Sequence, residues 1–244
     1  MAPRKRSHLG SRNQPELSRH TILQAAIQEF AAHGLEGARI DSIAQSARVN
    51  KALLYYYFRD KEGLYGAALD HTFGKLVETL DQVLDLDLAP AEKVLAYAGA
   101  HFDYVASNPI YQRLLQHELM RTGARNSLHF ERIVSRHLRP VFGKLAVVLA
   151  KGTKLGVFRQ VSPEQFMLSM VGVVVFYFSS MPITRAFSDL DLLAPTALRE
   201  RRAAVLDFIS AGLFRDPALA DHVLGLPHIT KADIPAADAQ SASL

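Results

Sequence analysis

The sequence predicts an all-α protein, and three observations lead to that prediction. Apolar residues recur at three- and four-residue spacing along much of the 244-residue chain, as they do on one face of an α-helix. Proline and glycine interrupt the pattern at intervals typical of the ends of helices. No run of alternating apolar and polar residues indicates a β-strand. We therefore expect helices joined by short turns.

The N-terminal quarter predicts an arm followed by three short helices. Residues 1–17 contain two prolines, a glycine and almost no apolar side chain, which indicates a flexible basic arm. A helix is expected from Ser18, with Gly34 at its end. The segment 40–62 then has the pattern of a short helix, a tight turn and a second short helix, with Asn50 in the position of an N-cap.

The remaining chain predicts a larger helical domain. A long helix is expected over 62–86, and Pro140 should kink a later one because proline cannot donate to the preceding turn. The other expected helices are 91–107, 109–120, 127–151, 163–180 and 196–214. The predicted domains are the basic arm at 1–17, a helix-turn-helix domain at 18–64, a larger helical domain at 65–225 and a loosely ordered tail at 226–244.

Charge is distributed unevenly along the chain. Residues 1–61 hold ten Lys and Arg against five Asp and Glu, whereas the remaining residues hold eighteen against nineteen. A basic first quarter on a near-neutral body is typical of a protein that binds nucleic acid through one domain, with a solvated basic face as the alternative. The chain has no cysteine, which excludes disulfides and thiolate metal sites and fits a cytoplasmic protein. The basic N-terminus lacks the apolar stretch of a secretory signal.

The segment 40–62 predicts a helix-turn-helix whose second helix enters the major groove of DNA. Lys51 can donate to guanine, and Ala52 is small enough to contact a thymine methyl. Leu54 and Phe58 are expected in the core. Consecutive helical residues are rotated by about 100°, so at least two of the three intervening tyrosines should be exposed. The predicted DNA-binding residues are Arg39, Asn50, Lys51, Ala52, Tyr55, Tyr56, Tyr57 and Lys61.

Residues 19–64 resemble the DNA-binding domain of the tetracycline-repressor (TetR) family. The first helix has the pattern R-x-x-I-L-x-A-A-x-x-x-F-x-x-x-G, and the next two have I-A-x-x-A-x-V-N-K-A-L-L-Y-Y-Y-F-x-x-K-E-x-L from residue 43. A weaker similarity to the family's C-terminal domains lies in G-V-F-R at 156–159. The chain departs from the family pattern at Arg48, where a turn glycine is usual, at Arg39, where a hydroxyl residue is expected, and at Leu53.

The resemblance implies a DNA-binding transcriptional regulator. It implies a three-helix DNA-binding domain on a larger all-helical domain, and a homodimer held by the last two long helices, here 163–180 and 197–214. A small-molecule effector bound in the larger domain would change the separation of the two DNA-binding domains and release DNA. The expected function is therefore that of a repressor, rather than an activator, acting on a palindromic operator.

Aromatic and histidine residues of the middle helices are the candidates for an effector pocket, because such pockets are apolar with a few polar anchors. Plain core packing is the alternative for each aromatic residue. The predicted pocket residues are His101, Phe102, Tyr104, Tyr111, Arg113, His117, Phe130 and Phe176. Neighbouring histidines and glutamate also suggest a metal, but no HExxH pattern supports it, so we expect no metal and no cofactor.

Two alternative interpretations stay open, and a third finds no support in the sequence. Residues 165–184 carry no charge and are long enough to span a bilayer, although their polar residues and proline favour a buried helix. A nucleic-acid-binding protein that does not read sequence would use the same basic region. An all-α enzyme finds no support, since the chain has neither a phosphate-binding glycine loop nor a nucleophile elbow.

Overall fold

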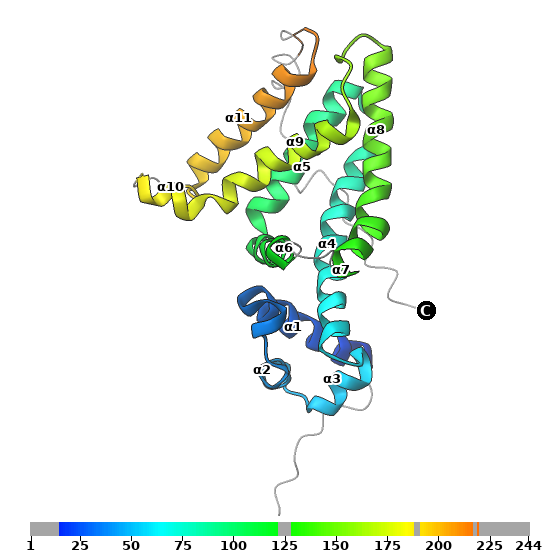
Figure 1. Cartoon of the computed structure of the whole chain (residues 1–244). Coiled ribbons are helices and arrows are strands. Elements are labelled where there is room, and N and C mark those ends of the chain that lie inside the picture. The colour runs from blue at the N-terminus through cyan, green and yellow to red at the C-terminus, as the bar shows by residue number, and fades with distance from the viewer. Residues whose placement is uncertain (1–14, 122–127, 188–190, 217–218, 220–244) are drawn as a thin grey trace, which may run out of the picture. The chain divides into compact units, whose positions relative to one another are not determined.

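The structure is a computed structural model that describes residues 15–121, 128–187, 191–216 and 219. Those residues are almost entirely helical (Figure 1), which confirms the predicted all-α class. Their only β-type pairing is an isolated bridge between Phe158 and Phe214. The α-helices are α1 Pro15–Gly37, α2 Ile40–Ser46, α3 Lys51–Phe58, α4 Lys61–Asp85, α5 Pro90–Ser107, α6 Pro109–Arg121, α7 Leu128–Ile133, α8 Arg139–Lys154, α9 Pro163–Ser179, α10 Met181–Phe187 and α11 Pro195–Leu213.

The chain folds as two compact units. The head unit contains α1 to α3, α4 up to Lys75, and α6 and α7; the body unit contains the rest of α4, α5 and α8 to α11. The predicted boundary after residue 64 places the stretch 109–135 in the larger helical domain. In the structure this stretch belongs to the head unit. Most of the predicted arm and the whole predicted tail, 226–244, lie outside the described residues.

In the head unit, α1 packs against α2, α3 and α6. Gly34 has a φ of 64°, and a Cβ there would lie 3.0 Å from Nδ1 of His117 on α6. The first helix was expected to end at Gly34. In the structure α1 breaks at this glycine and continues to Gly37, and the missing side chain lets α6 approach closely. Tyr65 of α4 is fully buried, and its hydroxyl donates to Oε1 of the buried Glu118 on α6 at 2.8 Å.

In the body unit, α5 contacts α8, α9 and α11. Arg202 of α11 donates from Nε to Asp103 of α5 at 2.8 Å and lies against Gly99, where a Cβ would come within 2.4 Å of its Nη2. Gly152 likewise leaves room for the ring of Phe158, which is fully buried. Gly99 therefore sets how closely α5 and α11 approach, and Gly152 lets the segment after α8 pack against that helix.

The prediction of a single kinked helix over 127–151 is wrong in detail. α7 ends at Ile133, a π-helical turn follows at Val134–Leu138, and α8 begins at Arg139 with Pro140 in its first turn. Proline is tolerated in the first turn because the N–H it lacks would be unsatisfied there anyway. The proline thus starts a new helix instead of bending an old one.

The charge-free stretch predicted at 165–184 covers most of α9 and the start of α10. Within the described parts of the chain, no single helix is long and apolar enough to cross a membrane. α9 and α10 reach that length and hydropathy only when joined across a bend of 57°.

Candidate functional site

The head unit holds a helix-turn-helix formed by α2 and α3 (Figure 1). Ile43 and Leu54 are buried, and the turn between the helices spans residues 47–50. Oδ1 of Asn50 accepts a hydrogen bond from the N–H of Leu53 at 2.9 Å, which confirms the predicted N-cap. This bond fixes where α3 begins, and therefore which side chains its first turn presents.

The exposed side of α3 carries the aromatic residues that the sequence places there. Leu54 and Phe58 are buried as predicted, and Tyr55 and Tyr56 are exposed, Tyr56 by 79%. Tyr57 is half-buried, with its ring edge-on to that of Tyr56 at 5.1 Å between centroids. The exposed rings can contact base edges, methyl groups or the sugar-phosphate backbone.

Lys51 and Ala52 lie exposed at the N-terminal end of α3. Lys51 forms an ion pair with Asp41 of α2, in which both side chains are more than half exposed. An exposed pair of this kind contributes little to stability, so it can open when another acceptor approaches. The sequence predicted Lys51 as a DNA-binding residue but did not predict its ion pair with Asp41. The turn between α2 and α3 brings these two side chains together.

Arg39 and Lys61 lie at two other helix ends. Arg39 precedes α2 and is exposed; its backbone N–H donates to Glu29 Oε1 at 3.0 Å, and its side chain makes no cap. Lys61 begins α4, and its Nζ donates to the carbonyl of Glu36 at 3.1 Å, near the end of α1. Lys61 therefore already stabilises a helix C-terminus in the free protein.

Two basic residues that the predicted set omits also flank α3. Arg48 lies in the turn before it and Arg59 directly after it, and both side chains are exposed. Both have positive φ, 55° and 67°. The sequence signal for Arg48 was its presence where the family pattern has glycine; Arg59 occupies a position that the pattern leaves unspecified.

The predicted effector-pocket residues do not form one site within either unit. Four belong to the head unit: Tyr111, Arg113, His117 and Phe130. Four belong to the body unit: His101, Phe102, Tyr104 and Phe176.

Two of those in the head unit, Tyr111 and His117, serve its packing. Tyr111 packs edge-on against Phe73 at 5.1 Å between ring centroids, and His117 Nε2 hydrogen-bonds with the Ala31 carbonyl at 3.3 Å. Arg113 is exposed and Phe130 half-buried. These contacts provide a structural role that the residue types alone did not reveal.

In the body unit, His101 is the most unusual of the predicted residues. It is buried, and its Nδ1 has no hydrogen-bond partner among the described residues. Burial lowers the pKa of His101 to about 4, because the charged imidazolium would lose its hydration. The next residue, Phe102, is buried against Phe178 at 5.5 Å between ring centroids. Tyr104 is half-buried, and Phe176 is exposed by 68%.

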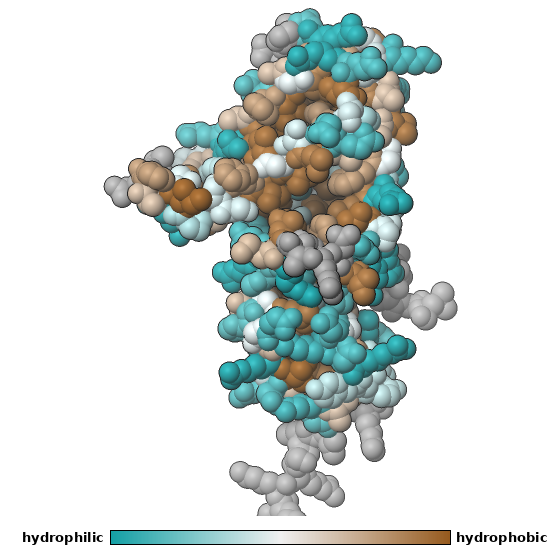
Figure 2. Space-filling model, viewed as in Figure 1, coloured by the Kyte–Doolittle hydropathy of each residue, from teal (hydrophilic) through white to brown (hydrophobic). Residues whose placement is uncertain are grey.

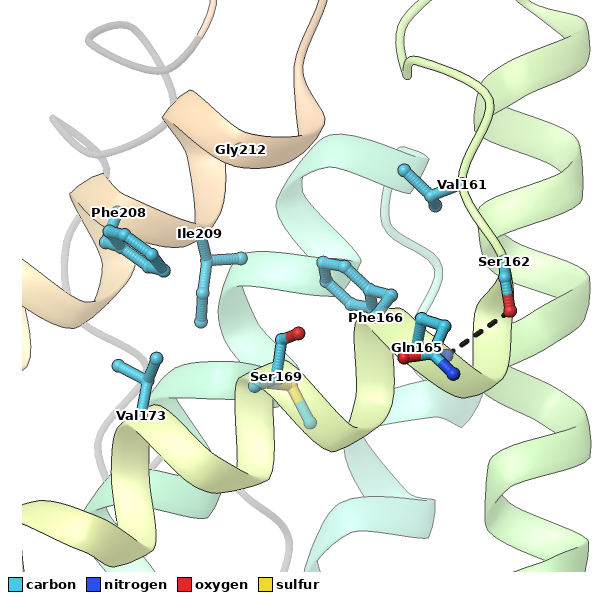
Figure 3. Close-up of a pocket in the computed structure, with 10 residues that line it drawn as sticks. Val161, Ser162, Gln165, Phe166, Ser169, Val173, Phe208, Ile209 and Gly212 are labelled. Carbon is cyan, nitrogen blue, oxygen red and sulfur yellow. Dashed lines mark hydrogen bonds between the residues drawn. The ribbon is translucent and has the colours of Figure 1, made fainter.

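A cavity of about 440 Å³, half open to solvent, lies between α9 and α11 in the body unit (Figure 3). Its wall is largely apolar, with polar atoms from Ser162, Gln165 and Ser169; Oγ of Ser162 also accepts the N–H of Gln165 at 3.3 Å, as a cap of α9. None of the eight predicted pocket residues lines it. The lining residues are Val161, Ser162, Gln165, Phe166, Ser169, Met170, Val173, Phe208, Ile209 and Gly212.

The same two helices expose large apolar side chains. Leu168 and Phe176 of α9 and Phe208 of α11 are each exposed by more than 60%. The space-filling view shows broad apolar surface on the body unit (Figure 2). In the described ranges, no group of three His, Cys, Asp or Glu side chains is arranged to hold a metal ion.

Two family models match the chain. Residues 22–68 match the model described as bacterial regulatory proteins, tetR family, and residues 90–209 match the tetracyclin repressor-like C-terminal domain. The first match contains α2, α3 and most of α1, and the second runs from α5 to α11. Together the two models cover both of the domains that the resemblance implied.

Similar proteins are transcriptional regulators and not enzymes. The chain is 30% identical over 203 residues to the HTH-type transcriptional repressor NicS of Pseudomonas putida, which covers 81% of this chain and 91% of that protein. It is 36% identical over 115 residues to the HTH-type transcriptional repressor SCO4008 of Streptomyces coelicolor, covering 47% of this chain and 56% of that one.

Solved structures show the same fold over most of the chain. A crystal structure of the transcriptional regulator SCO4942 of Streptomyces coelicolor aligns with a TM-score of 0.62 at 28% identity, covering 82% of this chain and 99% of that one. HlyIIR, a hemolysin II transcriptional regulator, aligns with a TM-score of 0.58 at 26% identity, covering 83% and 99%. By its helix-turn-helix, by both family models and by its similarity to NicS along nearly the whole of that protein, this chain belongs to the TetR family of DNA-binding transcriptional regulators.

Proposed function

We propose that the protein is a homodimeric repressor that binds a palindromic operator and releases it when a small-molecule effector binds the body unit. The observation that carries the proposal is the first turn of α3, where the cap by Asn50 presents Lys51 and Ala52 to solvent. A recognition helix of this class inserts its N-terminal residues into the major groove.

Within this proposal the DNA contacts fall into two groups. Lys51, Ala52 and Tyr55 read base edges, because they occupy the first turns of α3. Arg39, Tyr56, Tyr57 and Lys61 position the protein through phosphates. Asn50 uses Oδ1 for the cap, which leaves its side-chain N–H groups as donors to DNA.

The exposed apolar side chains of α9 and α11 support the homodimer. Single soluble chains seldom expose large apolar patches unless another surface covers them. α9 and α11 correspond to the predicted dimer helices, 163–180 and 197–214, and Phe176 and Phe208 are among their exposed residues. A two-fold dimer places its two helix-turn-helix segments in symmetric half-sites, hence a palindromic operator.

For the effector, the body unit favours a small and largely apolar molecule. The cavity between α9 and α11 has a volume within the usual range for small-molecule sites, roughly 300–1,000 Å³. His101, in the same unit, is a buried neutral imidazole whose Nδ1 has no hydrogen-bond partner among the described residues, but it does not line this cavity. Because a repressor acts on chromosomal DNA, we place the protein in the cytoplasm.

The experiment that tests the function is a binding selection from random duplex DNA at about physiological salt, where the non-specific electrostatic attraction is weakened. Enrichment of an inverted repeat, bound by two chains, is the expected result. Binding that persists at low salt with no enriched sequence would contradict the proposal and favour a nucleic-acid-binding protein that does not read sequence. The enriched duplex then serves for screening small molecules that release it.

A further inference from the structure

Helix α3 lies between two arginines whose backbone conformation favours glycine. Arg48 has a φ of 55° and Arg59 a φ of 67°, and across the described ranges no other residue except glycine has a positive φ. In this region the Cβ of an L-residue crowds its own backbone. Such conformations cluster at functional sites, where a side chain is needed in spite of its strain.

Arg48 occupies the position that ends α2. Its N–H donates to the Gln45 carbonyl at 3.1 Å, and the N–H of Val49 donates to the Ala44 carbonyl at 3.0 Å. These two bonds form a Schellman motif, whose left-handed residue is usually glycine. The turn itself therefore favours glycine at position 48.

Arg59 occupies an even tighter corner between α3 and α4. Its φ and ψ of 67° and −59°, together with a 2.8 Å bond from the N–H of Asp60 to the Phe58 carbonyl, define a γ-turn of the rare, strained kind. Asp60 precedes α4 and caps it by accepting the N–H of Gly63 at 2.6 Å, and a Cβ at Gly63 would crowd the Phe58 carbonyl oxygen. This short connection imposes the conformation on whichever residue stands at 59.

Neither guanidinium group has a partner among the described residues. Both side chains are exposed, and in that part of the chain neither makes an ion pair or a side-chain hydrogen bond. The neighbouring cations differ in this respect, since Lys51 pairs with Asp41 and Lys61 binds the Glu36 carbonyl. Within the described residues, no contact of their own side chains thus compensates the strain at Arg48 and Arg59.

We propose that Arg48 and Arg59 bind backbone phosphates of the operator at the two ends of the groove-inserted helix, an inference that rests on the proposed DNA-binding function. A helix inserted in the major groove is flanked by phosphate strands on both sides, and guanidinium groups bind phosphate through two parallel hydrogen bonds. Contacts at both ends of α3 fix its depth and tilt in the groove. They contribute affinity without reading sequence.

Glycine substitutions provide the test, because they remove the guanidinium and the strain together. R48G and R59G should each weaken binding by about 10-fold near 0.1 M salt, equally on the selected duplex and on a scrambled one, since a bond to a charged group is lost. The slope of log K against log salt should decrease by about 0.9 for each lost phosphate contact. Both variants should keep or raise the midpoint of thermal unfolding, because glycine adopts positive φ without crowding.

Matched variants separate charge from backbone effects. R48K and R59K should keep the salt slope of the wild type. R48A and R59A should lose it as the glycine variants do, without any gain in unfolding midpoint, and they provide the binding test should either glycine variant fail to fold. K154A removes an exposed cation from α8 in the body unit and should bind like the wild type.

Two results would overturn the inference while leaving the proposed function intact. One is wild-type affinity and salt slope in R48G and R59G; the other is a loss confined to the selected duplex, which would make these residues base readers. A wild-type protein that binds neither duplex would instead refute the proposed function, and the inference with it.

Discussion

Replacing Tyr65 by Phe removes one hydroxyl group from the buried contact between α4 and α6 in the head unit. That hydroxyl donates to Glu118 Oε1 at 2.8 Å, and both side chains are fully buried. Nη1 of Arg121 lies 3.4 Å from the same carboxylate oxygen, and its guanidinium lies over the Tyr65 ring. Burial, with a further contribution from Glu118, raises the pKa of Tyr65 well above its usual value, so the hydroxyl remains a donor at neutral pH.

The expected cost follows from the burial of the acceptor. Removing one partner of a buried hydrogen bond costs roughly 1–3 kcal/mol, and Glu118 would lose one donor while it retains Arg121. We expect Y65F to lower the free energy of unfolding by about 2 kcal/mol, with an unchanged dependence on denaturant. Phenylalanine fills the same space, so no cavity contributes.

Urea unfolding followed by circular dichroism at one fixed protein concentration measures this loss. Tyr56→Phe is the matched control, because it removes a hydroxyl from the same unit at a highly exposed position; its effect should stay within about 0.5 kcal/mol. A Y65F variant as stable as this control would refute the reasoning. The Tyr65 hydroxyl would then contribute no more than a solvated one.

Three further predictions concern the interface, the buried imidazole and the DNA contact. If α9 and α11 form the proposed homodimer, the double variant F176S/F208S should raise its dissociation constant by at least about 100-fold in sedimentation experiments, because buried aromatic residues dominate interface energies. V147S, at an exposed apolar residue of α8, is the control. Folding lowers the pKa of His101 from 6.5 to about 4, so between these pH values the unfolded state binds more protons than the folded state. The free energy of unfolding should therefore fall by up to about 3 kcal/mol as the pH drops from 6.5 to 4. Urea unfolding across this range should show a flatter dependence for His101→Gln, and an identical dependence would contradict the assignment. Lys51→Ala should lower affinity for the selected duplex by about 1–3 kcal/mol in competition titrations, whereas an equal loss on scrambled duplex would make Lys51 a phosphate contact.

Features set by a few neighbouring residues were predictable from the sequence. The cap by Asn50 and the start of α9 at Ser162 and Pro163 both follow from residue types at fixed offsets, and the structure confirms them. The burial of Leu54 and Phe58 followed from helical spacing alone. Local patterns suffice in these cases because capping and helical rotation act within one turn.

Features that depend on packing between distant segments were not predictable. His117 was selected as a ligand anchor from its type, yet it packs beside Gly34 and hydrogen-bonds with the Ala31 carbonyl, 86 residues away in sequence. Apolar periodicity also did not predict the separate short helix α10, Met181–Phe187, or the π-helical turn before α8. No spacing rule within one helix reveals which other helix will cover it.

Because α6 and α7 belong to the head unit, that unit is discontinuous in sequence. During synthesis the ribosome must make the stretch 76–108, which belongs to the body unit, before α6 can cover α1. A fragment that stops at Lys75 would expose the α1 surface that α6 buries and would lack Glu118 as the partner of Tyr65. A fragment for proteolysis or gene fusion that is designed on chain order alone would therefore leave the α1 surface without its α6 cover, so a head fragment should include α6.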